Sequence, residues 1–164
     1  MTSGRIVQIS VSSGGVPKRR VPDARITRGG VDGDRQRDTE HHGGADRAVC
    51  LYANERIAAL QQEGHTIAPG AMGENLTVEG LDWDEVVPGA QLALGEGVVL
   101  EITRYTSPCF NIAPVFLDGA YGRISQKRYP GWSRVYARVL SEGHVREGDA
   151  IRLTAPGVPG HLPQ

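Results

Sequence analysis

The amino-acid sequence predicts a mainly β protein, a barrel with a few helices, on the basis of two features. Of the 164 residues, 22 are glycine and 10 are proline, and these turn-forming residues divide the chain into short segments. Within the segments apolar and polar residues alternate, which is typical of strands that bury one face in a sandwich or a barrel.

Three segments show this alternation most clearly. The residues expected on their buried faces are Val7, Ile9 and Val11 in "RIVQISV", Val98, Leu100 and Ile102 in "VVLEITR", and Val135, Ala137 and Val139 in "RVYARVL". The segments "ENLTVEG", "QLALGEG" and "AIRLT" are shorter candidates of the same kind. We therefore expect several strands joined by turns.

One segment, "LYANERIAALQQEG", has the spacing of a helix instead. Its apolar residues Ala53, Ile57 and Leu60, with Val49 before them, recur at intervals of four, four and three. Such intervals place the residues on one face of a helix, and Gly64 provides a stop. A second, short helix is expected through "FNIAPVFLDG", where a proline limits the regular part.

The composition indicates one soluble globular domain, for which we expect the limits 1–154 and a loose tail over 155–164. The formal net charge of −1 gives no reason to bind nucleic acid or an anionic membrane. No apolar run reaches the roughly 18–20 residues that span a bilayer. The first residues, "MTSGRIVQIS", do not resemble a signal peptide. We therefore expect a cytoplasmic protein with reduced thiols.

The two cysteines are expected to differ in role. Cys50 lies in the apolar segment "RAVCLYA", so we expect it in the core. Cys109 follows Ser107 and Pro108, which predicts a helix capped by Ser107 with Cys109 in its first turn. Backbone N–H groups there would stabilise a thiolate, which could be a nucleophile, a persulfide carrier or a soft metal ligand. The alternative is a small core residue beside a turn.

Metal sites built only from cysteine and histidine are not expected. The possible ligands His41, His42, His65, Cys50 and Cys109 lack the CxxC or HxxxH spacing of a structural zinc site. Two cysteines also cannot supply the four ligands of an iron–sulfur cluster.

A glycine-rich polar segment, "GGVDGDRQRDTEHHGGADRAV", is the first of three candidate binding segments. Gly43 and Gly44 would let the backbone approach a ligand closely, and His42 could exchange a hydrogen bond near neutral pH. The alternative is a polar loop in which Asp46 caps a turn.

Two further segments carry charge beside a turn. In "SSGGVPKRR", Lys18 and Arg19 could bind a phosphate, although the segment lacks the P-loop pattern and could be a solvated basic turn. In "PGAMGENLTVEG", Glu74 and Asn75 could orient a ligand or merely close a tight turn.

Taken together and in order, four segments closely resemble the stand-alone bacterial MOSC-domain proteins, named after the C-terminal domain of molybdenum-cofactor sulfurase. These segments are "GDRQRDTEHHGGADRAVCLYA", "EGHTIAPGAMGENLTVEGLDW", "YTSPCFNI" and "GWSRVYARVLSEGHVREGD". The resemblance extends from about Gly4 to Thr154. It implies a closed β-barrel similar to the barrel domain of pyruvate kinase, and a hallmark cysteine that corresponds to Cys109.

The resemblance also implies which residues share a cleft with Cys109. The family's HGGxD pattern is matched by His42, Gly43, Gly44 and Asp46, and its GENL pattern by Gly73, Glu74, Asn75 and Leu76. The cofactor-binding residues expected from these matches and their surroundings are Lys18, Arg19, Gly43, Gly44, Glu74, Asn75, Thr106 and Ser107. We expect His42 or Asp46 to hydrogen-bond the substrate or help deliver a proton.

The function that the resemblance implies is a molybdenum-cofactor protein that reduces N-hydroxylated small molecules, with Cys109 as the metal ligand. Because nothing in the sequence would hold a flavin, haem or iron–sulfur cluster, we expect a separate reductase to supply electrons. The large sulfurases also contain a separate pyridoxal-phosphate domain. This chain has no room for such a domain, so we do not expect it to bind pyridoxal phosphate. The alternative is a sulfur carrier that takes a persulfide onto Cys109 from a sulfur donor. A third reading is a degenerate domain that only binds a partner.

Overall fold

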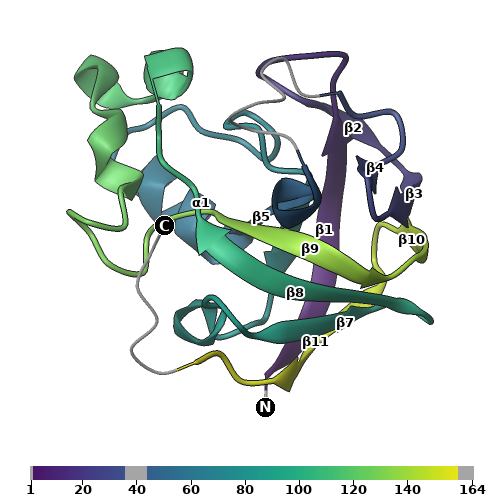
Figure 1. Ribbon diagram of the computed structural model, residues 1–164. Coiled ribbons are helices and arrows are strands. Elements are labelled where there is room, and N and C mark those ends of the chain that lie inside the picture. The colour runs from purple at the N-terminus through teal and green to yellow at the C-terminus, as the bar shows by residue number, and fades with distance from the viewer. Residues whose placement is uncertain (1, 36–43, 159–164) are drawn as a thin grey trace.

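A closed β-barrel forms the body of the protein (Figure 1). The computed structural model describes residues 2–35 and 44–158. The strands are β1 (Ser3–Val11), β2 (Arg19–Val21), β3 (Asp23–Thr27), β4 (Gly30–Val31), β5 (Val49–Ala53), β6 (Leu76–Glu79), β7 (Gln91–Leu94), β8 (Val98–Tyr105), β9 (Val135–Ser141), β10 (Gly143–Arg146) and β11 (Ala150–Ala155). The helices are α1 (Asn54–Gln62) and the 3-10 helices η1 (Ala45–Arg47), η2 (Trp83–Glu85), η3 (Phe110–Val115), η4 (Leu117–Gly119) and η5 (Tyr121–Ile124).

The barrel closes through β1. The strands pair in the order β11–β7–β8–β9–β5–β6–β1, and the first residues of β1 pair again with β11, for example Ser3 with Arg152. The later part of β1 pairs with β2, and β3, β4 and β10 form a separate small sheet. A closed ring leaves few strand edges unpaired. The predicted fold class, a mainly β barrel, is confirmed.

The core fills the inside of the ring with the residues that the alternation selects. Val98, Leu100 and Ile102 on β8 are buried, as are the three predicted residues of β9. In β1 the prediction holds for Ile9 and Val11 but not for Val7, because the register shifts between Ile6 and Gln8. Ile6 is buried beside Ile9 and Val11, while Val7 is only half-buried. A strand irregularity of this kind breaks the strict alternation of faces.

The predicted helix is present as α1, with Ile57 and Leu60 buried and Gly64 in a left-handed conformation two residues after its end. Val49 and Ala53, however, belong to β5 and not to the helix. All five residues of β5 are buried, and a strand covered on both faces reads as a continuous apolar run. In the sequence this apolar run is followed directly by the helix, so its residues were assigned to the helical pattern.

Three short helices, η3 to η5, follow β8 and form a cap at the upper left of Figure 1. Arg123 joins the cap to α1, since its guanidinium bonds Glu63 at 2.8 Å and stacks 4.0 Å from the ring centroid of Trp132. Arg56 of α1 stacks on the same ring at 4.8 Å. Cation–π contacts on one indole thus hold the cap in place.

The chain end stays ordered beyond the predicted domain limit of 154. Strand β11 ends at Ala155, and the Val158 N–H donates to the Pro88 carbonyl at 3.2 Å. Residues 159–164 of the expected tail lie outside the described part of the chain. Within the described part, no helix combines the length and apolar character that a membrane crossing requires.

Candidate functional site

A cavity of about 320 Å³ opens beside the cap, where the ends of several strands meet. Its walls come from the turn before β2, from β5, from the loop before β6, from the segment after β8 and from β9. The lining residues that carry chemistry are Lys18, Arg35, Cys50, Cys109, Arg134 and Tyr136. The barrel therefore brings both cysteines and three cations to one place.

Cys109 is exposed and lies on the wall of this cavity. It is the N-cap residue of η3, with an extended ψ of 171°, and its N–H donates to the Ser107 carbonyl at 2.6 Å. The prediction that Ser107 caps the helix is wrong by two positions, because that carbonyl turns the chain before η3 begins. Ser107 is itself exposed and lines the cavity.

Cys50 lines the same cavity from the barrel wall, although its side chain is buried as predicted. It stands opposite Tyr136 of β9 in the β5–β9 ladder. Burial raises the pKa of the Cys50 thiol to about 11 and that of Tyr136 to about 12. Both groups are therefore neutral near pH 7.

Lys18 forms a buried ion pair beneath the cavity. Its ammonium lies 2.6 Å from Asp34 Oδ2, and the two side chains are 8% and 4% exposed. Asp34 also accepts hydrogen bonds from the Ser12 N–H at 2.9 Å and from Asn75 Nδ2 at 2.9 Å. The charge of Lys18 is thus balanced within the protein. Arg19, the other predicted phosphate ligand, is exposed on β2 and does not line the cavity.

The residues of the GENL pattern lie at or next to the cavity wall and bond to neighbouring segments. Asn75 is fully buried, accepts from the Cys50 N–H at 3.0 Å and donates to the Ser10 carbonyl at 3.2 Å. Glu74 is fully buried too, and its Oε2 accepts from the Gly70 N–H at 3.1 Å. Burial raises the pKa of Glu74. Of the four residues, Gly73 lines the cavity directly, in a left-handed conformation with φ of 92°.

The HGGxD residues are described only in part. His42 and Gly43 lie outside the described residues, while Gly44 and Asp46 are exposed. Gly44 has φ of 95°, and the Asp46 carboxylate lies 3.6 Å from Arg138 Nε. Neither described residue of the pattern is among those that line the cavity.

Sequence reasoning missed Arg134 and Arg35, which both line the cavity. Arg134 is 8% exposed, and its Nη1 donates to the Met72 carbonyl at 2.6 Å. Beside it, Thr106 is buried and donates its N–H to the Arg134 carbonyl at 3.1 Å, while its hydroxyl has no partner among the described residues. Because Val135 was assigned to the buried face, the alternation placed Arg134 next to it on the solvent face.

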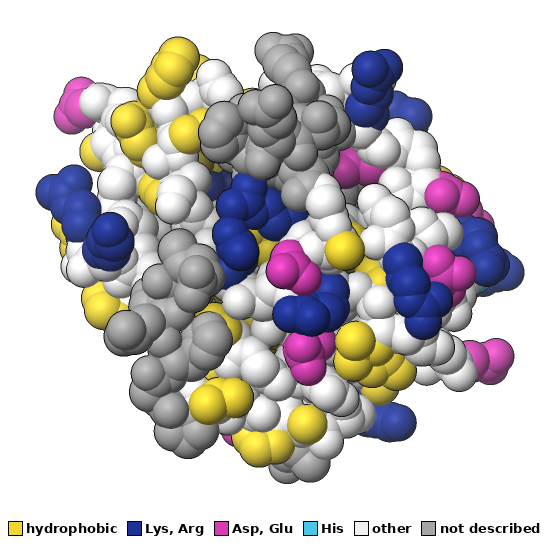
Figure 2. Space-filling view, viewed as in Figure 1, with side chains coloured by type: hydrophobic (Ala, Val, Ile, Leu, Met, Phe, Trp, Pro, Cys, Tyr) yellow, Lys and Arg dark blue, Asp and Glu magenta, His cyan; other side chains and the backbone are white. Residues whose placement is uncertain are grey.

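Figure 2 shows Lys and Arg side chains gathered near the middle of this view, over β5 and β9.

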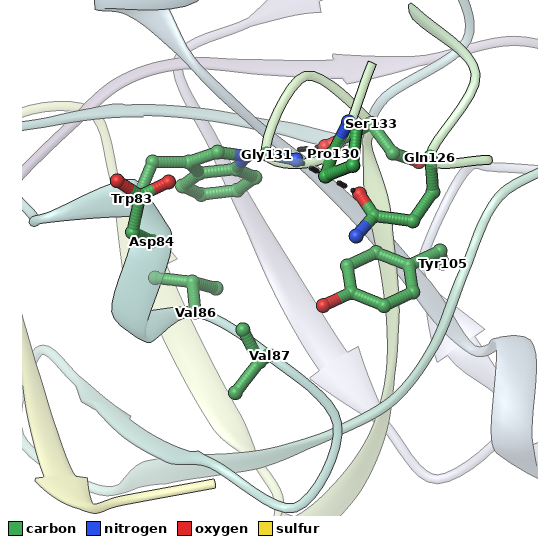
Figure 3. Close-up of a pocket in the computed structure, with 9 residues that line it drawn as sticks. All are labelled: Trp83, Asp84, Val86, Val87, Tyr105, Gln126, Pro130, Gly131 and Ser133. Carbon is green, nitrogen blue, oxygen red and sulfur yellow. Dashed lines mark hydrogen bonds between the residues drawn. The ribbon is translucent and has the colours of Figure 1, made fainter. Parts of the chain in front are cut away.

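A second, smaller pocket of about 180 Å³ lies at the end of β8 (Figure 3). Tyr105 points into it, and Trp83 and Gln126 form part of its wall. The indole of Trp83 donates to the Ser133 carbonyl at 3.1 Å, and Gln126 accepts from the Gly131 N–H at 3.0 Å. The polar walls are thus largely engaged in structural bonds, and no cysteine lines this pocket. The cavity at Cys109 is the stronger candidate.

The buried ion pair gives a testable prediction of stability. Replacing Asp34 by Asn leaves the buried ammonium of Lys18 without a countercharge, which is expected to cost about 3 kcal/mol or more of unfolding free energy. Urea denaturation measures this loss. The matched control is Asp46→Asn, which removes an exposed carboxylate and should change the free energy of unfolding by about 0.5 kcal/mol or less. Equal effects of the two substitutions would contradict the assignment.

The two thiols should react at different rates. At about pH 8, iodoacetamide is expected to alkylate Cys109 in the folded protein and to leave Cys50 unmodified, because Cys50 is buried and its pKa is raised. Peptide mass spectrometry reads out both sites. In urea both should be labelled, and folded Cys109→Ser should take up no label. Comparable labelling of both cysteines in the folded wild type would refute the difference.

Comparison with known proteins identifies the family of the chain. The model of the MOSC domain matches residues 38–152. The protein YflK of Bacillus subtilis is 34% identical over 148 residues, which are 89% of this chain and 66% of YflK. A protein of Gibberella moniliformis named "Reductase" is 33% identical over 129 residues, 76% of this chain and 22% of that protein. The chain thus spans slightly less than two thirds of YflK and a small part of the reductase.

Solved structures show the same fold. The crystal structure of YiiM from Geobacillus stearothermophilus is similar with a TM-score of 0.74 and 27% sequence identity, covering 95% of this chain and 77% of that one. The family model covers well over half of the chain. The chain therefore belongs to the MOSC domain family, which is associated with the molybdenum cofactor.

Proposed function

We propose that the chain binds the molybdenum cofactor through Cys109 and reduces N-hydroxylated compounds with electrons from a separate protein. The observation that carries this proposal is an exposed cysteine on the wall of a cavity that also presents cationic side chains. A thiolate suits a soft metal, and guanidinium groups suit the anionic parts of a pterin cofactor.

The residues at the cavity fit such a group. Because Asp34 neutralises Lys18, the positive charge of the cavity comes from Arg35 and Arg134. No cluster of three or more Cys, His, Asp or Glu in the described part of the chain could hold a metal ion by itself. A metal at Cys109 would therefore depend on ligands that a cofactor brings.

Of the two thiols, only that of Cys109 would bind the metal. When bound, the cofactor supplies the redox chemistry of the N–O bond. Cys109, exposed at the wall, would hold the metal, whereas the Cys50 thiol keeps its proton near neutral pH and cannot compete as a thiolate. The exposed side chains of Ser107 and Asn111 would orient the substrate by hydrogen bonds.

The electron source would be another protein. Cleavage of an N–O bond consumes an electron pair and protons and releases water, so each turnover needs an external reductant. The relative named "Reductase" extends far beyond the matched region, since this chain covers 22% of it. This length supports a division in which the reducing power comes from outside the barrel.

A sulfur carrier is the second candidate, favoured by the exposure of Cys109 to a protein donor. A persulfide there would be passed on without a bound metal. After incubation with a cysteine desulfurase and cysteine, a carrier gains about one sulfur atom on Cys109 in peptide mass spectra. A barrel that only binds a partner gains none.

The donor requirement gives a direct test. Protein from a host that makes the cofactor is expected to reduce an amidoxime when a reduced viologen dye supplies electrons. NADH without a partner protein should give no turnover. Cys109→Ser should lose activity by about a hundredfold or more, a transition-state loss of about 2.7 kcal/mol, while Cys50→Ser retains it. Full activity in Cys109→Ser, or turnover with NADH alone, would overturn the proposal.

A further inference from the structure

Arg134 is a buried arginine on the wall of the cavity. It directly precedes β9, is 8% exposed and lines the cavity together with Cys109. Its Nη1 donates to the Met72 carbonyl at 2.6 Å, which restrains the position of the guanidinium. An arginine so placed has lost most of its freedom before any ligand arrives.

The opposite edge of this guanidinium has no hydrogen-bond partner within residues 2–35 and 44–158. Nε is buried and makes no hydrogen bond among the described residues, and no hydrogen bond or ion pair with a described residue involves Nη2. Nε and Nη2 together form one edge of the planar group, with two parallel donors spaced for two oxygens of one anion. The described residues thus engage Nη1 and leave the bidentate edge, including the buried Nε, without a hydrogen-bond partner.

No carboxylate in the described part of the chain forms an ion pair with Arg134. The carboxylate of Asp34 is engaged by Lys18 at 2.6 Å. Glu74 is electrostatically coupled to Arg134 but forms no ion pair with it, and burial raises the pKa of Glu74. Arg35 adds a second cation to the same cavity. A buried cation without a directly paired carboxylate is costly, so a site of this kind favours an anion.

We propose that the Nε–Nη2 edge of Arg134 is a binding site for an oxyanion, a phosphate or carboxylate group, inside the cavity of Cys109. Two sources share this chemistry, the phosphate of a bound cofactor and an anionic group of the substrate. The site does not require a metal at Cys109, and it holds whether or not the redox function does.

The test uses the full-length chain from a host that cannot make the molybdenum cofactor, with inorganic phosphate as the probe. Calorimetry at constant ionic strength should show binding, and thermal unfolding should shift upward with phosphate. Arg134→Lys keeps the charge but loses the paired donors, so the affinity should fall about tenfold or more.

The matched control is Arg138→Lys on β9, four residues after Arg134, where Arg138 lies beside Glu101 and Asp46 outside the cavity. This variant should bind phosphate like the wild type. Circular dichroism verifies that Arg134→Lys is folded. Wild type that fails to bind phosphate, or folded Arg134→Lys that binds it equally well, would overturn the site.

A second arm identifies the source of the anion. If cofactor-loaded protein no longer binds inorganic phosphate, the cofactor's own phosphate occupies Arg134. If it still binds, the site receives an anionic group of the substrate. Both results support an oxyanion site, and absent molybdenum would count against the proposed function alone.

Discussion

The buried ion pair between Lys18 and Asp34 sets the character of the candidate site. Their atoms lie 2.6 Å apart, and Asp34 also accepts from Asn75, which in turn accepts from the Cys50 N–H. This chain of bonds ties the segments after β1 to β5 and β6, and so fixes one wall of the cavity. It also neutralises Lys18 internally, which leaves Arg35 and Arg134 as the cations that a ligand meets. A buried pair adds little net stability compared with apolar side chains of similar size, whereas the loss of one partner alone is costly.

The same barrel wall gives the two cysteines different chemistry. Cys50 is enclosed between strands, and burial raises its pKa to about 11. Cys109 lies beyond the end of β8, where the chain leaves the ring and enters η3, and it is exposed. The fold thus distinguishes two residues of the same type: burial keeps the Cys50 thiol protonated, and exposure makes Cys109 accessible to a ligand.

The sequence predicted the architecture well and the site in part. Alternation in β8 and β9 identified the core faces, since these strands follow regular pleating, but the register shift at Gln8 in β1 leaves no mark in composition. The family resemblance led us to expect Cys109 and Ser107 at the site, and both residues line the cavity. Arg134 was missed because a buried, cavity-facing arginine and a solvated one have the same alternation. Charge balance between Lys18 and Asp34 needs tertiary contacts between separate loops, which periodicity does not encode.

The molybdenum content per chain tests the central claim most directly. Wild type and Cys109→Ser would be made in a host able to synthesise the cofactor, purified, shown to be folded and compared by metal analysis, with Cys50→Ser as the matched control. If Cys109 holds the metal, wild type and Cys50→Ser should contain molybdenum near one atom per chain, and Cys109→Ser should contain almost none. Equal molybdenum in all three proteins, or none in folded wild type, would contradict the account.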